Sequence, residues 1–111
     1  MTIAIGNAQF TGPHFLTACP TGNSSGLYAI MIKPDPVSKP DDYTLIYIGE
    51  TSNFEERLTT SHHRYDCWKR QAGSEDKIFY GLHVMKSSTE AQRLDLESDL
   101  IQQHDPICNK Q

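Results

Sequence analysis

The stretch LIYIGETSNFEER, Leu45–Arg57, marks a point where a predicted strand runs into a predicted helix. Its first half is rich in β-branched and aromatic residues, which favour a buried strand. In its second half, Ser52 or Asn53 can cap a helix, and Asn53 with Glu56 three residues later has the spacing of a capping box. A phenol, a glycine and a guanidinium thus come together, as a site for nucleotides requires and as an ordinary strand–turn–helix corner also allows.

Two further apolar runs predict the rest of a sheet. They cover residues 26–33 and 78–85, and residues 43–49 form the strand of the opening stretch. Residues 34–42 contain three prolines and three aspartates, so we expect a loop there. The simplest arrangement of the first two strands is an antiparallel hairpin.

Helices are predicted before and after the third strand in the sequence. The first is expected from about Asn53 to Ser61, and the cationic segment 62–71 continues as a second helix or turn. Ser87 with Glu90 predicts the cap of a last helix, which Pro106 ends. Its apolar stripe is predicted at Ala91, Leu94, Leu100 and Ile101. The order β-β-α-α-β-α predicts an α+β fold, a small three-stranded, mostly antiparallel sheet flanked by helices.

The length of 111 residues predicts one compact domain with its own core. Residues 1–25 are rich in Gly, Thr, Asn, Ser and Pro, and we expect a mostly irregular N-terminal extension with a short strand at Thr2–Ile5. Residues 26–111 form the predicted functional domain.

Composition and cysteine content predict where the protein resides. The mean hydropathy is −0.54, and no apolar run approaches the about 20 residues of a membrane helix, so we expect no membrane association. The first basic residue is Lys33, so no secretory signal is expected. Cys19, Cys67 and Cys108 are odd in number and widely spaced, which argues against a disulfide framework and predicts a reducing, cytoplasmic location.

The formal net charge of −4 disfavours nucleic-acid binding, because Lys and Arg neutralise the phosphates in such interfaces. The charge is uneven, however, since residues 57–77 hold five basic and three acidic residues, with His62 and His63 in addition. This segment fits either a solvated helix face or a surface for phosphate groups.

Strand alternation predicts the position of two tyrosines. Tyr28 and Ile30 share one face of the first strand, and Leu45, Tyr47 and Gly49 share one face of the second. If the strands pair, Tyr28 and Tyr47 lie near each other. They are then either half-buried core residues or members of a site.

Glu97 is a carboxylate within the apolar stripe of the last helix, three residues from Leu94 and from Leu100. Its desolvation must be offset by a partner or a bound cation. An ion pair with Arg57 is one solution. A metal ion is the other, because carboxylate oxygens suit Mg²⁺.

Five features together resemble the GIY-YIG nuclease superfamily. Gly26–Tyr28 (GLY) and Tyr47–Gly49 (YIG) resemble its two signature tripeptides, and Arg57 lies ten residues beyond Tyr47, at the spacing of the family's arginine. Glu97 falls on the last helix, where the family has its metal-binding glutamate, and DPICN ends in Asn109, as in many members. The resemblance spans about three quarters of the chain.

This resemblance implies a metal-dependent DNA endonuclease that hydrolyses phosphodiester bonds. Glu97 would hold Mg²⁺ or Mn²⁺, and Arg57 would neutralise charge developing on the phosphate. Tyr28 or Tyr47 would activate water, with its pKa lowered by the metal and Arg57, and Gly49 would let the backbone approach a phosphate.

The position one helical turn after the arginine, a His or Tyr in many members, is Ser61 here. We therefore expect one of the next two residues, His62 or His63, to take that catalytic part after a small shift, with His62 nearer in register; the alternative is an ordinary pair of surface histidines. The residues predicted to bind DNA are Gly49, His63, Arg64, Lys69, Arg70 and Asn109.

Glu50 follows the second tripeptide where members often carry Lys or a small polar residue, and it either adds a metal ligand or repels phosphate. Trp68, next to basic residues, either stacks on bases or fills the core.

Two other classes of protein stay open. His63 with Cys67 and His104 with Cys108 are pairs at i, i+4 spacing that would together provide a His₂Cys₂ zinc site. A catalytically inactive domain of the same fold would instead bind DNA or protein. In the enzyme, a partner protein or a second copy of the chain would supply specificity.

Overall fold

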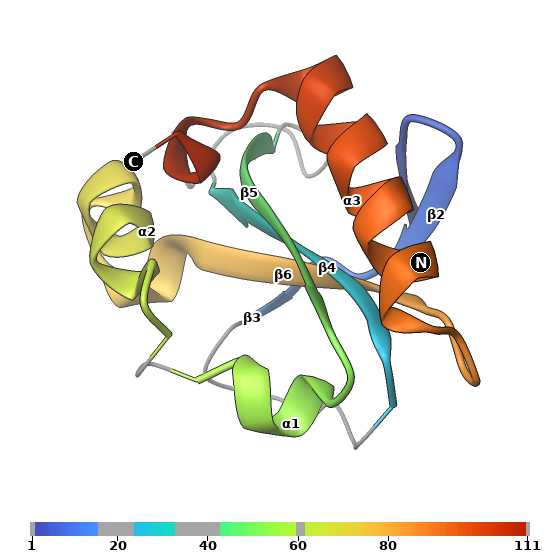
Figure 1. The fold of residues 1–111 in the computed structure, drawn as a ribbon. Coiled ribbons are helices and arrows are strands. Elements are labelled where there is room, and N and C mark those ends of the chain that lie inside the picture. Colours follow the sequence, from blue (N-terminus) through green and yellow to red (C-terminus); the bar gives the residue numbers. More distant parts are fainter. Residues whose placement is uncertain (1, 16–23, 33–42, 60–61, 111) are drawn as a thin grey trace.

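The computed structural model describes residues 2–15, 24–32, 43–59 and 62–110. Its strands are β1 (Thr2–Ile5), β2 (Ala8–Thr11), β3 (His14–Phe15), β4 (Gly26–Ile32), β5 (Thr44–Thr51) and β6 (Ile78–Val84). Its helices are α1 (Phe54–Arg57), α2 (Tyr65–Ala72) and α3 (Glu90–His104), with the 3₁₀ turns η1 (Glu75–Lys77) and η2 (Ile107–Asn109). Figure 1 shows the helices packed around the sheet, which confirms the α+β prediction.

The main sheet has four antiparallel strands in the order β3-β6-β4-β5, one more than predicted. The apolar β4 lies inside it and β5 forms an edge. Tyr28 pairs with Gly49 and Ile30 with Tyr47, but the register shifts beyond Ile30, so that Met31 pairs with Leu45. This bulge turns Leu45 to the opposite core from Tyr47, and the prediction that Leu45, Tyr47 and Gly49 share one face is wrong for Leu45.

The N-terminal segment is more regular than predicted. The strand at Thr2–Ile5 is confirmed, and it forms a hairpin with β2. Strand β3 then pairs with β6 and becomes the other edge of the main sheet. The short alternating run at Ala8–Thr11, buried at Ala8 and Phe10, was the signal for the second strand.

Helices α1 and α3 begin at side-chain caps, whereas α2 has none. Asn53 accepts a hydrogen bond from the Glu56 backbone, as its spacing predicts, but α1 ends already at Arg57. The cap predicted at Ser87 with Glu90 is wrong, because the capping box of α3 joins Thr89 and Gln92.

The side of α3 that faces the sheet also differs from the prediction. Leu94 is 43 % exposed and Ala91 is exposed, whereas Arg93 and Leu100 are buried. Among the described helices, none is both long and apolar enough to cross a membrane.

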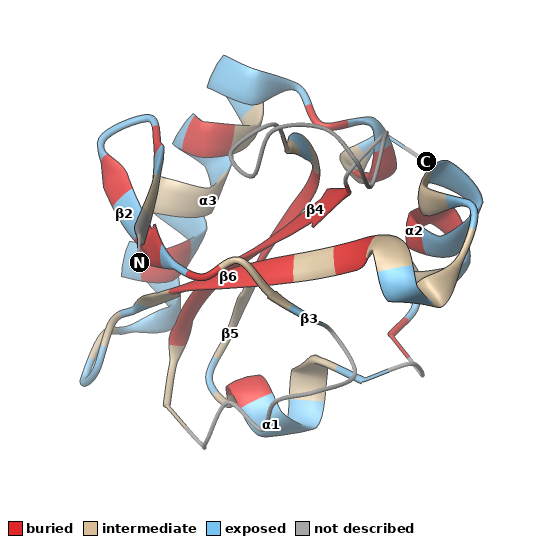
Figure 2. Cartoon of the chain, turned by 180° about the vertical axis from the view of Figure 1, so that it is seen from behind, coloured by how far each residue is buried: buried red, intermediate tan, exposed pale blue. Residues whose placement is uncertain are grey.

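Two cores lie on opposite faces of the sheet. Figure 2 shows the strand between them, β4, as buried. One core, under α1 and α2, contains Tyr28, Ile30, Ile32, Ile46, Tyr47, Phe54, Trp68 and Tyr80. The other, under α3 and the β1–β2 hairpin, contains Ile5, Ala8, Phe10, Leu27, Ala29, Ile48 and Leu100. Alternate residues of β4 therefore serve both cores, and this strand is buried along its whole length.

A disulfide joins Cys67 of α2 to Cys108 of η2, which contradicts the argument against disulfides. An odd cysteine count excludes only complete pairing, and Cys19 lies outside the described residues. The expected cytoplasmic location stays a prediction. The disulfide uses both sulfurs that the zinc alternative needs, and no group of three or more His, Cys, Asp or Glu side chains within the described ranges would hold a metal.

Candidate active site

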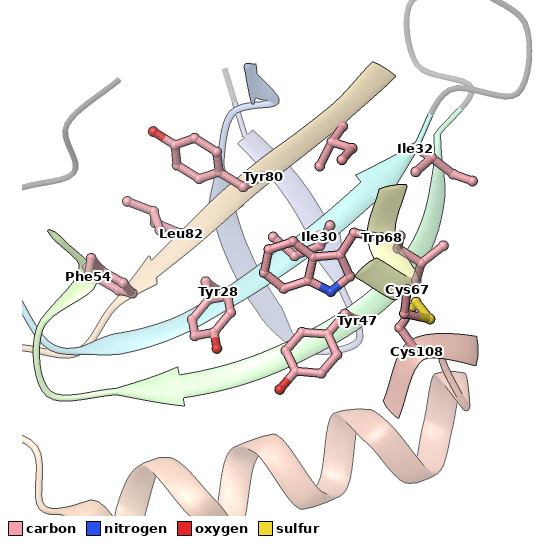
Figure 3. Close-up of a cluster of buried hydrophobic side chains, with 12 residues drawn as sticks. Tyr28, Ile30, Ile32, Tyr47, Phe54, Cys67, Trp68, Tyr80, Leu82 and Cys108 are labelled. Atoms are coloured by element: carbon pink, nitrogen blue, oxygen red, sulfur yellow. A yellow bond between two sulfur atoms is a disulfide. The ribbon is translucent and has the colours of Figure 1, made fainter. Parts of the chain in front are cut away.

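Tyr28 and Tyr47 come together on one face of the sheet, as strand alternation predicts. Their rings are 6.0 Å apart, and both side chains are at least nine-tenths buried. In Figure 3 both hydroxyls point the same way, across β5 and toward the side where α3 lies. The two signature tripeptides therefore contribute their tyrosines to one site.

Gly49 makes room for Tyr28. A Cβ atom at position 49 would lie 2.3 Å from Cζ and 2.4 Å from the hydroxyl oxygen of Tyr28. The structure thus gives Gly49 a structural part, and its predicted approach to phosphate stays a prediction. Its missing side chain seats the phenol of the neighbouring strand.

The Tyr28 hydroxyl contacts three other residues of the site. The Arg57 Nε–H donates to it over 3.3 Å, and His62 Nε2 lies 2.7 Å from it. The Tyr28 hydroxyl also hydrogen-bonds Tyr47. Four of the five residues predicted as catalytic are therefore in one hydrogen-bonded group.

Burial raises the pKa of both tyrosines. For Tyr28 the neighbouring Tyr47 adds to this effect, and the Arg57 guanidinium opposes it through its hydrogen bond and its charge. For Tyr47 the hydrogen bond from Tyr28 and the charge of Arg57 oppose it. The expected lowering by Arg57 is present, but within the protein alone desolvation is larger.

Arg57 leaves the end of α1 and reaches two partners. Besides Tyr28, it donates from Nη2 to Nδ1 of His63 over 3.2 Å. The Arg57 pKa is raised overall, because the tyrosines and Glu50 outweigh the lowering effect of burial. A permanently charged, planar donor suits the contact with a phosphate.

Glu97 is half-buried on α3. It accepts a hydrogen bond from the backbone of Glu50, and its charge acts on Tyr47. Burial, and then the Glu50 carboxylate, raise the Glu97 pKa. No salt bridge found among the described residues includes Glu97, so the predicted ion pair with Arg57 is wrong.

Glu50 has a partner that the sequence pattern did not indicate. Arg93, one turn before Glu97 on α3, donates from Nε to the Glu50 carboxylate over 3.0 Å. Its Nη1 donates to the carbonyl and hydroxyl oxygens of Ser88, at 2.9 and 3.0 Å. This pair neutralises the carboxylate beside the site. The signal was Arg93 itself, a basic residue i−4 from Glu97 on the same helix face.

Asn109 and Trp68 are structural. The Asn109 amide accepts from the backbone N–H of Ile48 and donates to its carbonyl, both at 2.9 Å, so it holds β5 in place, and its predicted DNA contact stays a prediction. Trp68 is fully buried and its ring packs on Tyr47, which settles its two readings in favour of the core.

Of the remaining predicted DNA-binding residues, His63 contacts Arg57, and Lys69 and Arg70 lie on α2. His63, Lys69 and Arg70 are exposed and Arg64 is partly exposed. Ser61 lies outside the described residues. These side chains form a basic surface on α2 and the turn before it.

The site fits Mg²⁺ or Mn²⁺ in one particular way. Mg²⁺ binds through one or two carboxylates, several waters and substrate phosphates, and needs no closed protein cage. Glu97 provides one carboxylate next to the tyrosines, while Glu50 is paired with Arg93. The residues present therefore suit a metal ion that is completed by the phosphate of a substrate.

Comparison with known proteins agrees with this geometry. A family model described as the GIY-YIG catalytic domain matches residues 24–111, most of the chain. No curated protein matches the sequence closely enough to count as a relative.

Proposed function

The chain belongs to the GIY-YIG family of nucleases, and from this premise we propose that it is a metal-dependent endonuclease that hydrolyses DNA phosphodiester bonds. The observation that carries the proposal is the hydrogen-bonded group around Tyr28, with Arg57 and His62 on its oxygen and Glu97 beyond Tyr47. A fold that only binds DNA does not need these groups to converge.

Tyr28 receives the proton of the attacking water in this proposal. Donors that reach a phenol oxygen stabilise its deprotonated form, and two N–H groups reach Tyr28. The Tyr28 phenol first releases its own proton to solvent, along its hydrogen bond to the Tyr47 hydroxyl. Water then attacks phosphorus as its proton moves to the Tyr28 phenolate oxygen, the bond from phosphorus to the leaving oxygen breaks, and the leaving oxygen takes a proton from solvent. Arg57 donates to the same Tyr28 oxygen, and its positive charge offsets the negative charge that develops on the phosphate.

Glu97 would hold the metal ion. When bound, a divalent metal supplies Lewis-acid polarisation of a phosphate oxygen and stabilises the leaving oxygen. The backbone N–H of Glu50 fixes the carboxylate in place, and Arg93 removes the charge of Glu50 that would otherwise repel the substrate.

The basic surface of His63, Arg64, Lys69 and Arg70 would contact the DNA backbone. Such contacts give affinity without sequence specificity. A partner protein or a second copy of the chain would then determine which DNA is cut.

The test is cleavage of plasmid, single-stranded and branched DNA with Mg²⁺ or Mn²⁺. Glu97→Ala should lose at least about 100-fold in rate, whereas Asp95→Ala, an exposed carboxylate of the same helix, should not. Cleavage that survives Glu97→Ala or EDTA contradicts the proposed mechanism.

The second function to test is a DNA- or protein-binding domain without activity. The net charge of −4 favours it, because it weakens the attraction to DNA. Wild-type protein that cuts no form of DNA but binds one of them would support this function and overturn the first.

A further inference from the structure

His62 is held in a fixed orientation by four rings. Its ring lies 4.4 Å from Trp68 and stacks on His63 at 4.6 Å, while the rings of Tyr28 and Tyr47 meet it edge-on at 5.8 and 5.4 Å. Only 6 % of the residue is exposed. The imidazole is therefore held in one orientation, with Nε2 facing Tyr28 and Nδ1 facing Arg64.

One ring nitrogen of His62 has to be an acceptor. The backbone N–H of Arg64 points at Nδ1 over 3.0 Å, and an amide N–H can only donate. A neutral His62 must then carry its hydrogen on Nε2. That nitrogen lies 2.7 Å from the Tyr28 hydroxyl, so the hydrogen bond runs from His62 to Tyr28.

The charges around His62 keep it neutral. The groups that act on it are Arg57, His63 and Arg64, all basic, with no carboxylate among them. Burial is the largest effect, and together these groups lower the His62 pKa to about 3. A second proton would also have to displace the Arg64 amide from Nδ1.

We propose that His62 is a fixed hydrogen-bond donor that positions Tyr28, and does not accept the proton of Tyr28. A histidine that takes up a proton in catalysis needs a free lone pair facing that proton and an acceptor for its other N–H. His62 has the opposite arrangement. Its part in catalysis rests on the proposed endonuclease function, whereas the direction of its hydrogen bonds does not.

The first test is ¹⁵N NMR of the histidine rings in the full-length wild-type protein. We expect His62 to show hydrogen on Nε2, an unprotonated Nδ1, and no titration between pH 5 and 8, a range chosen to cover ordinary histidine titration at about pH 6.5. Loss of this signal in His62→Gln assigns it, and backbone-linked assignment serves if that variant fails to fold. Hydrogen on Nδ1, or a cationic ring near pH 6, overturns the proposal.

The second test compares variants by DNA cleavage. A glutamine amide nitrogen can reach the place of Nε2 and donate, while the shorter asparagine can replace only Nδ1. His62→Gln should stay within about tenfold of the wild-type rate, and His62→Asn should lose about 10²- to 10³-fold. Gln and Asn variants that are folded and equally impaired contradict the proposal. If the wild type cuts no DNA, the endonuclease function fails while the NMR result still decides the role of His62.

Discussion

Replacing Arg93 by methionine should destabilise the fold far more than an ordinary surface substitution. The side chains of Arg93 and Glu50 are only 7 % and 18 % exposed, and the two charges meet at 3.0 Å. Arg93→Met leaves the Glu50 carboxylate without its partner and leaves the Ser88 oxygens without their donor. Removing one member of a buried pair costs about 3–5 kcal/mol.

That loss is large for a chain of this size. At roughly 0.05–0.15 kcal/mol per residue, a domain of 111 residues has a free energy of unfolding of about 6–17 kcal/mol. With about 4 °C per kcal/mol, the melting temperature should fall by about 12–20 °C. Urea unfolding followed by circular dichroism gives the free energy directly.

A double variant separates the charge effect from packing. Glu50→Gln with Arg93→Met removes both charges, and we expect it to recover at least about 2 kcal/mol relative to Arg93→Met alone. Lys110→Met is the matched control, because it breaks the Lys110–Asp105 pair, whose side chains are 55 % and 69 % exposed, and should change stability by less than about 0.5 kcal/mol. Additive losses in the double variant, or a loss in Lys110→Met equal to that in Arg93→Met, would refute the reasoning.

Three further outcomes follow from the site. Gly49→Ala should displace the Tyr28 phenol and abolish cleavage, measured beside circular dichroism, since its Cβ would lie 2.4 Å from the hydroxyl; a folded, fully active variant would contradict this. Asn109→Ala should cost about 1–3 kcal/mol in thermal unfolding, because it leaves both backbone groups of Ile48 without their partner, and a change below about 0.3 kcal/mol would count against it. With its pKa at about 3, His62 stays neutral in the fold but gains a proton on unfolding below about pH 6.5. Stability should therefore fall as pH drops from 6.5 toward 3, and less steeply in His62→Gln; equal slopes would be the contrary result.

The sequence carries most of the fold because its strands are strongly apolar and clearly bounded. Runs such as Gly26–Ile32 have one reasonable structure, and their alternation places Tyr28 and Tyr47 together. Where the local sequence is compatible with two structures, the pattern alone does not predict which one forms. Both Ser87 with Glu90 and Thr89 with Gln92 have capping-box spacing. The chain uses the second pair, and the positive φ of 62° at Ser87 departs from the extended backbone of an N-cap residue.

Contacts between distant segments were beyond a reading of local patterns. The separation of 43 residues between Glu50 and Arg93 gives no periodic signal, and their pairing depends on how α3 crosses β5. The disulfide has the same origin, since Cys67 and Cys108 meet only because α2 and η2 lie over the same core. Charge and cysteine patterns report on neighbours along a helix, whereas these partners are neighbours only in the fold.

The edge position of β5 explains why distant side chains gather at this site. An edge strand has backbone N–H groups, at every second residue, that no neighbouring strand satisfies. In β5 the N–H of Ile48 is satisfied by the Asn109 side chain, and that of Glu50 by the Glu97 carboxylate. Asn109 and Glu97 bind the N–H groups that a further strand would otherwise satisfy. They therefore fix the segment around Gly49, and with it the distance between the tyrosines and Glu97. A covering strand would satisfy the edge as well, but it would leave no carboxylate beside Tyr47.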